Sequence, residues 1–138
     1  MLVGIQAELQ HRLSTVDEVV FALLFGSRTK RTSRADSDWD VAVYLADHLT
    51  SKQQFHIRLT LLAELEDLGS IDLVVLNDAP PLLAQRALQG ERLLIKEPSI
   101  FVRFFVRTAA TAGDEGFWHG LHAAARARRL EEGQFGRP

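Results

Sequence analysis

The chain has no cysteine, no long apolar run and almost no excess of either charge, with a formal net charge of -2 over 138 residues. Without cysteine there is no disulfide framework, no thiolate metal site and no catalytic thiol. The near-neutral balance gives no general attraction to nucleic acid or anionic lipid, and no segment approaches the roughly 18 apolar residues of a membrane span. The N-terminus lacks the pattern of a secretion signal. We therefore expect a cytoplasmic globular protein with no membrane partner and no direct binding of nucleic acid.

Hydrophobic patterning predicts strands and helices in alternation. Short runs rich in strand formers predict strands at residues 19–25, 39–45, 71–76 and 92–96. Apolar residues at helical spacing predict helices at residues 2–13, from Thr50 or Ser51 to about Gly69, at 82–89, at 99–112 and near 117–130.

This order predicts the α/β (α+β) class, with a small mixed sheet and helices packed on it. No linker divides the chain, so we expect a single domain over residues 1–138. Residues 99–131 would form a C-terminal helical extension and residues 132–138 a frayed tail. Thr50 with Gln53, or Ser51 with Gln54, has the spacing of a capping box.

The exit of the first predicted strand carries a Gly-Ser pair followed by basic residues. Gly26 has no side chain to keep a ligand from the backbone, and Ser27 offers an N–H and a hydroxyl. Four cations follow within eight residues, at Arg28, Lys30, Arg31 and Arg34, and favour anions. The pattern fits a phosphate loop, although basic surface loops share it.

Two aspartates stand at the start of the second predicted strand. Alternation places Asp38 and Asp40 on one face of that strand, and Trp39 on the other. Two converging carboxylates repel each other, and a Mg²⁺ ion held by hard oxygen ligands removes that repulsion. The alternative is a solvated strand entry, where aspartate is common.

A third carboxylate, Asp72, is the second residue of an otherwise apolar predicted strand, Ile71 to Leu76. If that strand lies beside residues 39–45, Asp72 joins the aspartate pair across the sheet. Three carboxylates there would hold two metal ions for displacement at phosphorus. The alternative is an exposed strand end, with or without a salt bridge.

Gly26-Ser27, ten further residues and then Asp38-Trp39-Asp40 resemble the signature of the nucleotidyltransferase superfamily related to DNA polymerase β. Asp72 stands where that superfamily carries its third aspartate. The short chain and residues 79–96 further resemble the minimal nucleotidyltransferase (MNT) antitoxins that pair with HEPN-domain toxins. The resemblance covers most of residues 17–110, with departures at Arg31 and Ala35 in the loop.

The resemblance implies a Mg²⁺-dependent enzyme that transfers AMP from ATP to a tyrosine of a cognate HEPN RNase toxin and so neutralises it. By position, Asp38, Asp40 and Asp72 would be the catalytic residues and the ligands of two Mg²⁺ ions. The residues that would bind the nucleotide are Gly26, Ser27, Arg28 and Lys30.

Three other functions remain open from the sequence: an antitoxin that acts by occlusion alone, a transferase acting on a small molecule, and a nucleic-acid terminal transferase. Tyr44 shares the face of Asp40 and would touch the nucleotide, touch the target or pack in the core. The aromatic residues between 101 and 105 fit a core or a partner contact better than a base-stacking platform, and His119 with His122 fits a surface pair.

Overall fold

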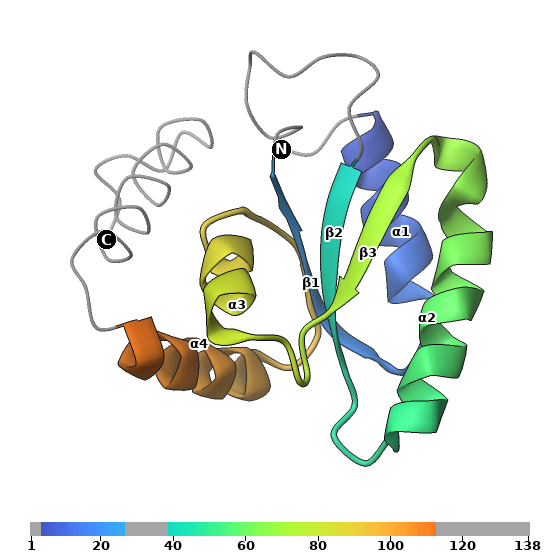
Figure 1. The fold of residues 1–138 in the computed structure, drawn as a ribbon. Helices are drawn as coiled ribbons and strands as arrows, with labels where there is room; N and C mark the ends of the chain where they lie inside the picture. Colours follow the sequence, from blue (N-terminus) through green and yellow to red (C-terminus); the bar gives the residue numbers. More distant parts are fainter. Residues whose placement is uncertain (1–3, 27–38, 113–138) are drawn as a thin grey trace.

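The computed structural model describes residues 4–26 and 39–112 (Figure 1). The elements in chain order are α1 (Ile5–Ser14), β1 (Val19–Phe25), β2 (Trp39–Leu45), α2 (Ser51–Leu65), the 3₁₀ turn η2 (Glu66–Leu68), β3 (Ile71–Val75), α3 (Pro81–Leu88), β4 (Glu91–Ile95) and α4 (Pro98–Ala112).

The predicted elements within the described residues are confirmed. β1 and β2 have the predicted ends, the other ends differ by up to three residues, and α2 ends at Leu65, four residues before Gly69, with η2 between them. The helix predicted from residue 2 begins at Ile5, after Gly4. The helical segment predicted near 117–130, the tail 132–138 and the histidine pair lie outside the described residues. None of the described helices is long and apolar enough to cross a membrane.

The four strands form one mixed sheet in the order β3-β2-β1-β4. β2 is parallel to β3, whereas β1 is antiparallel to both β2 and β4. This confirms the predicted small mixed sheet. It also confirms that the strand carrying Asp72 lies beside the strand carrying Asp40.

Helices cover both faces of the sheet, α1 and α2 on one and α3 and α4 on the other (Figure 1). Side-chain alternation along β2 divides the core accordingly. Val41 and Val43 pack with α1 and α2, and Trp39 lies against that cluster. Ala42 and Tyr44 pack with α3 and α4, around the buried Phe101 and Phe104. The aromatic residues of α4 therefore belong to the core, as predicted.

A capping box marks the start of α2. The Thr50 hydroxyl accepts from the Gln53 N–H at 3.1 Å, and the Gln53 side-chain oxygen accepts from the Thr50 N–H at 2.8 Å. This reciprocal capping box satisfies two backbone donors. Of the two pairs that the sequence allowed, Thr50 with Gln53 forms the box.

Candidate functional site

Three strand ends meet at the upper edge of the sheet in Figure 1. The parallel strands β2 and β3 both begin there, and β1, antiparallel to β2, ends there. The register places Asp40 directly opposite Asp72, and Phe25, the last residue of β1, opposite Asp40. The edge therefore brings Gly26, Asp40 and Asp72 together from three separate parts of the sequence.

Gly26 lies in direct contact with the Asp40 carboxylate. A Cβ atom on Gly26 would stand 1.9 Å from Asp40 Oδ2 and 2.8 Å from its Cγ, well inside any tolerated contact. The Gly26 φ of 83° is also one that residues with a side chain rarely adopt. Space and backbone conformation independently require glycine at the exit of β1.

Asp40 and Asp72 bring two carboxylates to neighbouring strands. Neighbouring strands are about 4.8 Å apart, and like charges directly opposite each other destabilise a sheet. Asp40 is half-buried and Asp72 is exposed. Within residues 4–26 and 39–112, no cation forms a salt bridge with Asp72. Asp72 therefore lies at an exposed strand end, with no salt bridge to any residue that the structure describes.

Such a pair suits a divalent cation. Carboxylate oxygens are the ligands that Mg²⁺ takes in proteins, and a cation between Asp40 and Asp72 would turn repulsion into attraction. Two carboxylates alone make an incomplete cage, and the described part of the chain holds no group of three or more acidic or histidine side chains placed to share a metal ion. The sequence supplies a third carboxylate, Asp38, at the residue just before β2.

Several predicted site residues fall outside the described residues. These are Ser27, Arg28, Lys30 and Asp38, all within 27–38. Their roles stay predictions from the sequence. The two residues that bound this segment, Gly26 and Trp39, are described, and both lie at the acid-bearing edge.

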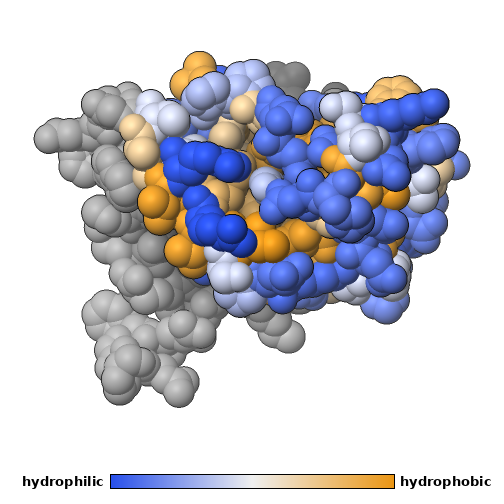
Figure 2. Space-filling model, turned by 90° about the horizontal axis from the view of Figure 1, so that it is seen from below, coloured by the Kyte–Doolittle hydropathy of each residue, from blue (hydrophilic) through white to orange (hydrophobic). Residues whose placement is uncertain are grey.

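A polar pocket of about 420 Å³ lies at the other end of β2 and β3, seen from below in Figure 2. Figure 2 views this end of the molecule and shows hydrophilic side chains around patches of apolar surface. Its lining residues are Tyr44, Asp47, Leu49, Thr50, Ser51, Gln54, Asn77, Asp78 and Arg107.

Tyr44 belongs to this pocket and not to the acid edge. It is four residues along β2 from Asp40, or about 13 Å at the usual rise of a strand. Its hydroxyl donates to Asp47 Oδ1 at 2.6 Å, and burial together with this hydrogen bond raises the pKa of Tyr44. Packing, the alternative to nucleotide contact considered from the sequence, is therefore the role that the structure supports.

Sequence reasoning did not identify the pocket. Its signal was the polar residues that stand two and three residues beyond two neighbouring parallel strands, Asp47 after β2 and Asn77 with Asp78 after β3. Because the carboxyl ends of parallel strands lie at one edge of a sheet, these residues are expected to lie close together.

Comparison with known proteins gives the family. The sequence profile described as "Polymerase beta, Nucleotidyltransferase" matches residues 7–99, more than half of the chain. No curated protein matches the chain.

Solved structures give the same fold over nearly the whole chain. A toxin–antitoxin complex, MntA–HpeT, in a variant with two Asp-to-Glu substitutions, is 23% identical, with a TM-score of 0.59 over 91% of this chain and 93% of that one. A toxin–antitoxin complex with AMP-PNP is 22% identical, with a TM-score of 0.58 over 94% of both chains.

A third similar structure is a complex of a tri-AMPylated HEPN toxin with an MNT antitoxin from Shewanella oneidensis. It is 20% identical, with a TM-score of 0.54 over 91% of this chain and 93% of that one. The profile match covers all three residues that meet at the acid-bearing edge, Gly26, Asp40 and Asp72. With its mixed sheet and this edge, the chain belongs to the polymerase β nucleotidyltransferase family.

Proposed function

We propose that this chain is a Mg²⁺-dependent nucleotidyltransferase of the MNT antitoxin type, which transfers AMP from ATP to a tyrosine of a cognate HEPN toxin in the cytoplasm and so neutralises it. One observation carries the proposal: Asp40 lies opposite Asp72 in the sheet while Gly26 closes on the Asp40 carboxylate. A structural strand end has no need of two opposed carboxylates or of a position that only glycine can occupy.

Asp40 and Asp72, with Asp38 as a third ligand, are the residues that would hold the metal, most simply as two ions. Bound Mg²⁺ supplies charge neutralisation for the triphosphate and stabilises the charge that develops on the leaving pyrophosphate. The exposed position of Asp72 leaves its carboxylate open to an incoming group.

The reaction is a displacement at the α-phosphorus of ATP. The tyrosine oxygen forms the new P–O bond, the bond to pyrophosphate breaks, and the phenolic proton passes to a base. Asp72 would accept that proton or orient the hydroxyl, and its exposed position beside Asp40 supports this role. Gly26 lets the backbone approach the phosphates, and Ser27, Arg28 and Lys30 follow it in sequence as further phosphate contacts.

The choice of partner is supported by the similar structures. They include toxin–antitoxin complexes, one with AMP-PNP and one whose HEPN toxin carries three AMP groups. These chains match this one over more than nine-tenths of its length, so a separate substrate-binding domain, as a small-molecule transferase would need, is not part of the shared fold.

The test is mass spectrometry of the cognate HEPN protein after co-expression with wild-type chain, with Asp40→Asn, with Asp38→Asn/Asp40→Asn, or with Asp47→Asn. The last variant makes the same substitution at the pocket end of the sheet. We expect AMP-sized increments with wild type and Asp47→Asn, and none with the other two. A stable complex without added mass under wild-type conditions would instead make the chain a binding antitoxin.

A further inference from the structure

The turn between α3 and β4 packs so closely against the end of β1 that a side chain at Gly90 would not fit. A Cβ atom on Gly90 would lie 2.2 Å from the Leu24 carbonyl oxygen and 2.7 Å from Phe25 Cβ. The φ of Gly90 is not positive, so its backbone conformation is open to any residue. Position 90 therefore requires glycine because of limited space alone. The atoms that limit the space belong to Leu24 and Phe25, the two residues directly before Gly26.

A bulge in β4 brings Gly90 to this place. Ala22 pairs with Leu94, but the next residue of β1, Leu23, pairs with Arg92. Leu93 is thus the extra residue of β4, and its side chain is buried in the core. The bulge sets Glu91 opposite Leu24, so that Gly90 comes to the last residues of β1.

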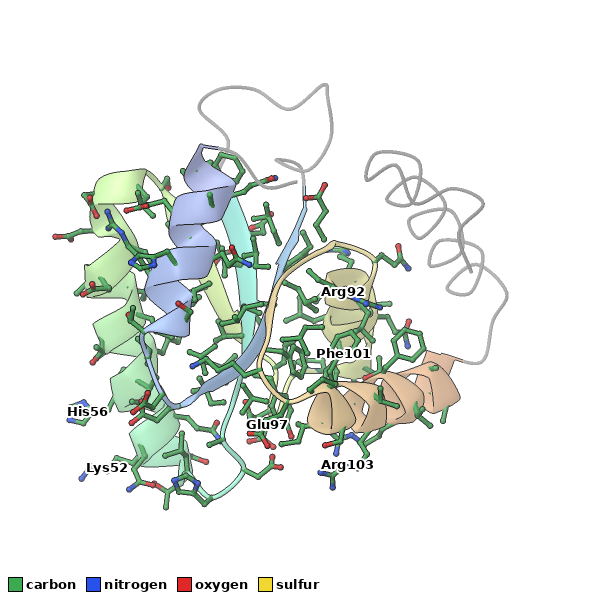
Figure 3. The ribbon with its side chains drawn as sticks, turned by 180° about the vertical axis from the view of Figure 1, so that it is seen from behind. Lys52, His56, Arg92, Glu97, Phe101 and Arg103 are labelled. Atoms are coloured by element: carbon green, nitrogen blue, oxygen red, sulfur yellow. The ribbon has the colours of Figure 1, made fainter. Side chains whose placement is uncertain are left out.

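The start of β4 is held from both faces of the sheet. On the α1 side, Gln6 Nε2 donates to Glu91 Oε2 at 3.4 Å. On the α4 side, the Arg92 guanidinium lies 5.0 Å from the centre of the Phe101 ring, as the labelled side chains in Figure 3 show. Displacement of this turn would therefore meet resistance, and an added methyl group at Gly90 would press on β1.

The last residues of β1 are consequently enclosed on two sides. Gly90 contacts Leu24 and Phe25 on one side, and Gly26 contacts the Asp40 carboxylate on the other. Both contacts are closer than any Cβ atom would allow. Movement of the β1 end is therefore transmitted to Asp40, and through the strand register to its neighbour Asp72.

We propose that Gly90 is a positioning residue for the metal site, acting through the end of β1 on the Asp40 carboxylate; this rests on the proposed function. Gly90 touches neither nucleotide nor metal in this proposal. Because Gly90 has no side chain, the start of β4 can pack closely against the end of β1. This packing fixes the position of the β1 end and keeps Gly26 in contact with the Asp40 carboxylate.

The test measures Mn²⁺ binding in the presence of ATP, with electron paramagnetic resonance as the detection method. Three proteins are compared: wild-type chain, Gly90→Ala and Leu61→Ala. Leu61 lies on α2 and is fully buried in the cluster on the α1–α2 face of the sheet, so Leu61→Ala lowers the melting temperature and leaves the turn that carries Gly90 unchanged. We expect Gly90→Ala to bind Mn²⁺ about tenfold more weakly, as loss of a supporting contact does at other metal sites. Leu61→Ala should bind as wild type does.

Activity gives a second readout. The Mg²⁺ concentration for half-maximal AMP transfer should rise in Gly90→Ala by the same factor as the Mn²⁺ dissociation constant. A Gly90→Ala protein that melts lower but binds Mn²⁺ like wild type would overturn the inference and leave the proposed function intact. Wild-type chain that binds no Mn²⁺ with ATP would overturn the proposed function and this inference together.

A milder variant serves if Gly90→Ala does not fold. Gln6→Ala removes the hydrogen bond to Glu91, and Gln10→Ala makes the same change one turn further along α1 at an exposed position. We expect Gln6→Ala to weaken Mn²⁺ binding by about twofold, the effect of losing one modest hydrogen bond. Equal Mn²⁺ affinities for these two variants would overturn the inference.

Discussion

The two ends of the parallel pair β2–β3 carry similar residues, but the contacts of these residues differ. Both ends have aspartates, Asp40 with Asp72 at one and Asp47 with Asp78 at the other. At the pocket end, Asp47 accepts from the Tyr44 hydroxyl. At the acid end, the carboxylates stand opposite each other in neighbouring strands.

The pocket end is a network of satisfied polar groups. The Asn77 side chain accepts from the Leu45 N–H at 2.9 Å and donates to the Leu45 carbonyl at 2.7 Å, while Thr50 and Gln53 cap α2. Each of these contacts lowers the free energy of the fold. At the acid end, two carboxylates stand on neighbouring strands and Gly26 has a backbone conformation unfavourable to other residues. The pocket end thus shows contacts that stabilise the fold, whereas the acid end holds the residues that we propose for catalysis.

The largest effect should come from Gly26→Ala, which puts a methyl group where the Asp40 carboxylate stands. Displacement of that carboxylate by about 1 Å should lower the rate of AMP transfer at least about 100-fold. Gly4→Ala is the matched control, because Gly4 also has a positive φ, of 57°, but a Cβ there meets nothing within 4 Å. Similar AMP-transfer rates in the two variants would contradict a specific effect of the contact between Gly26 and Asp40.

At the pocket end, Asn77→Ala should cost stability and leave catalysis alone. The variant leaves the N–H and C=O of the fully buried Leu45 without their side-chain partner. We expect a loss of about 2 kcal/mol in the free energy of unfolding, measured by urea denaturation. Asp78→Ala, at the exposed neighbouring position, should change little. If folded Asn77→Ala lost AMP transfer, the pocket end would also be needed for the reaction, which would contradict this separation of the two ends.

Asp72→Asn should separate stability from function at the acid end. Removing one of two opposed charges should raise the stability of the metal-free protein by up to about 1 kcal/mol. Mg²⁺ with ATP should raise the melting temperature of wild type but not of this variant, because a ligand stabilises only the protein that binds it. A less stable metal-free Asp72→Asn would mean that the carboxylate pair is not repulsive.

The smallest effect concerns an aspartate with a direct cation partner. The Asp67 carboxylate receives hydrogen bonds from the Arg12 guanidinium, one of them at 3.1 Å, and this lowers the pKa of Asp67. A carboxyl group with a lowered pKa contributes stability above its unfolded pKa, about 4, and loses it as the pH falls through the folded value.

Asp67→Asn should therefore melt slightly lower than wild type at pH 7, and the difference should shrink as the pH falls below the unfolded pKa of about 4 and through the lower folded value. Melting temperatures across this pH range check the prediction. The control Glu66→Gln, also exposed, should follow wild type throughout. A difference that grew on acidification would contradict the assigned direction of the pKa shift.

The sequence predicted the acid edge because its signals are local or follow from strand alternation. The spacing from Gly26 to Asp40 and the apolar run around Asp72 were enough to place these residues together. Gly90 could be predicted only as a helix stop, because its contact with Leu24 depends on a bulge that no local pattern encodes. The pocket was missed because its residues are satisfied by partners up to 32 residues away. Asp38, Ser27, Arg28 and Lys30 lie outside the described residues and stay predictions.

The most direct test asks which end of the sheet holds the metal. Mn²⁺ added in substoichiometric amounts with ATP broadens the NMR signals of nearby amides, so the affected residues locate the ion. We predict that the amides of Gly26, Asp40, Ile71 and Asp72 broaden first, while those of Asp47, Leu49 and Asn77 stay sharp. Broadening that begins at the pocket residues, or spreads equally over both ends, would contradict the assignment of the acid edge as the nucleotidyltransferase site.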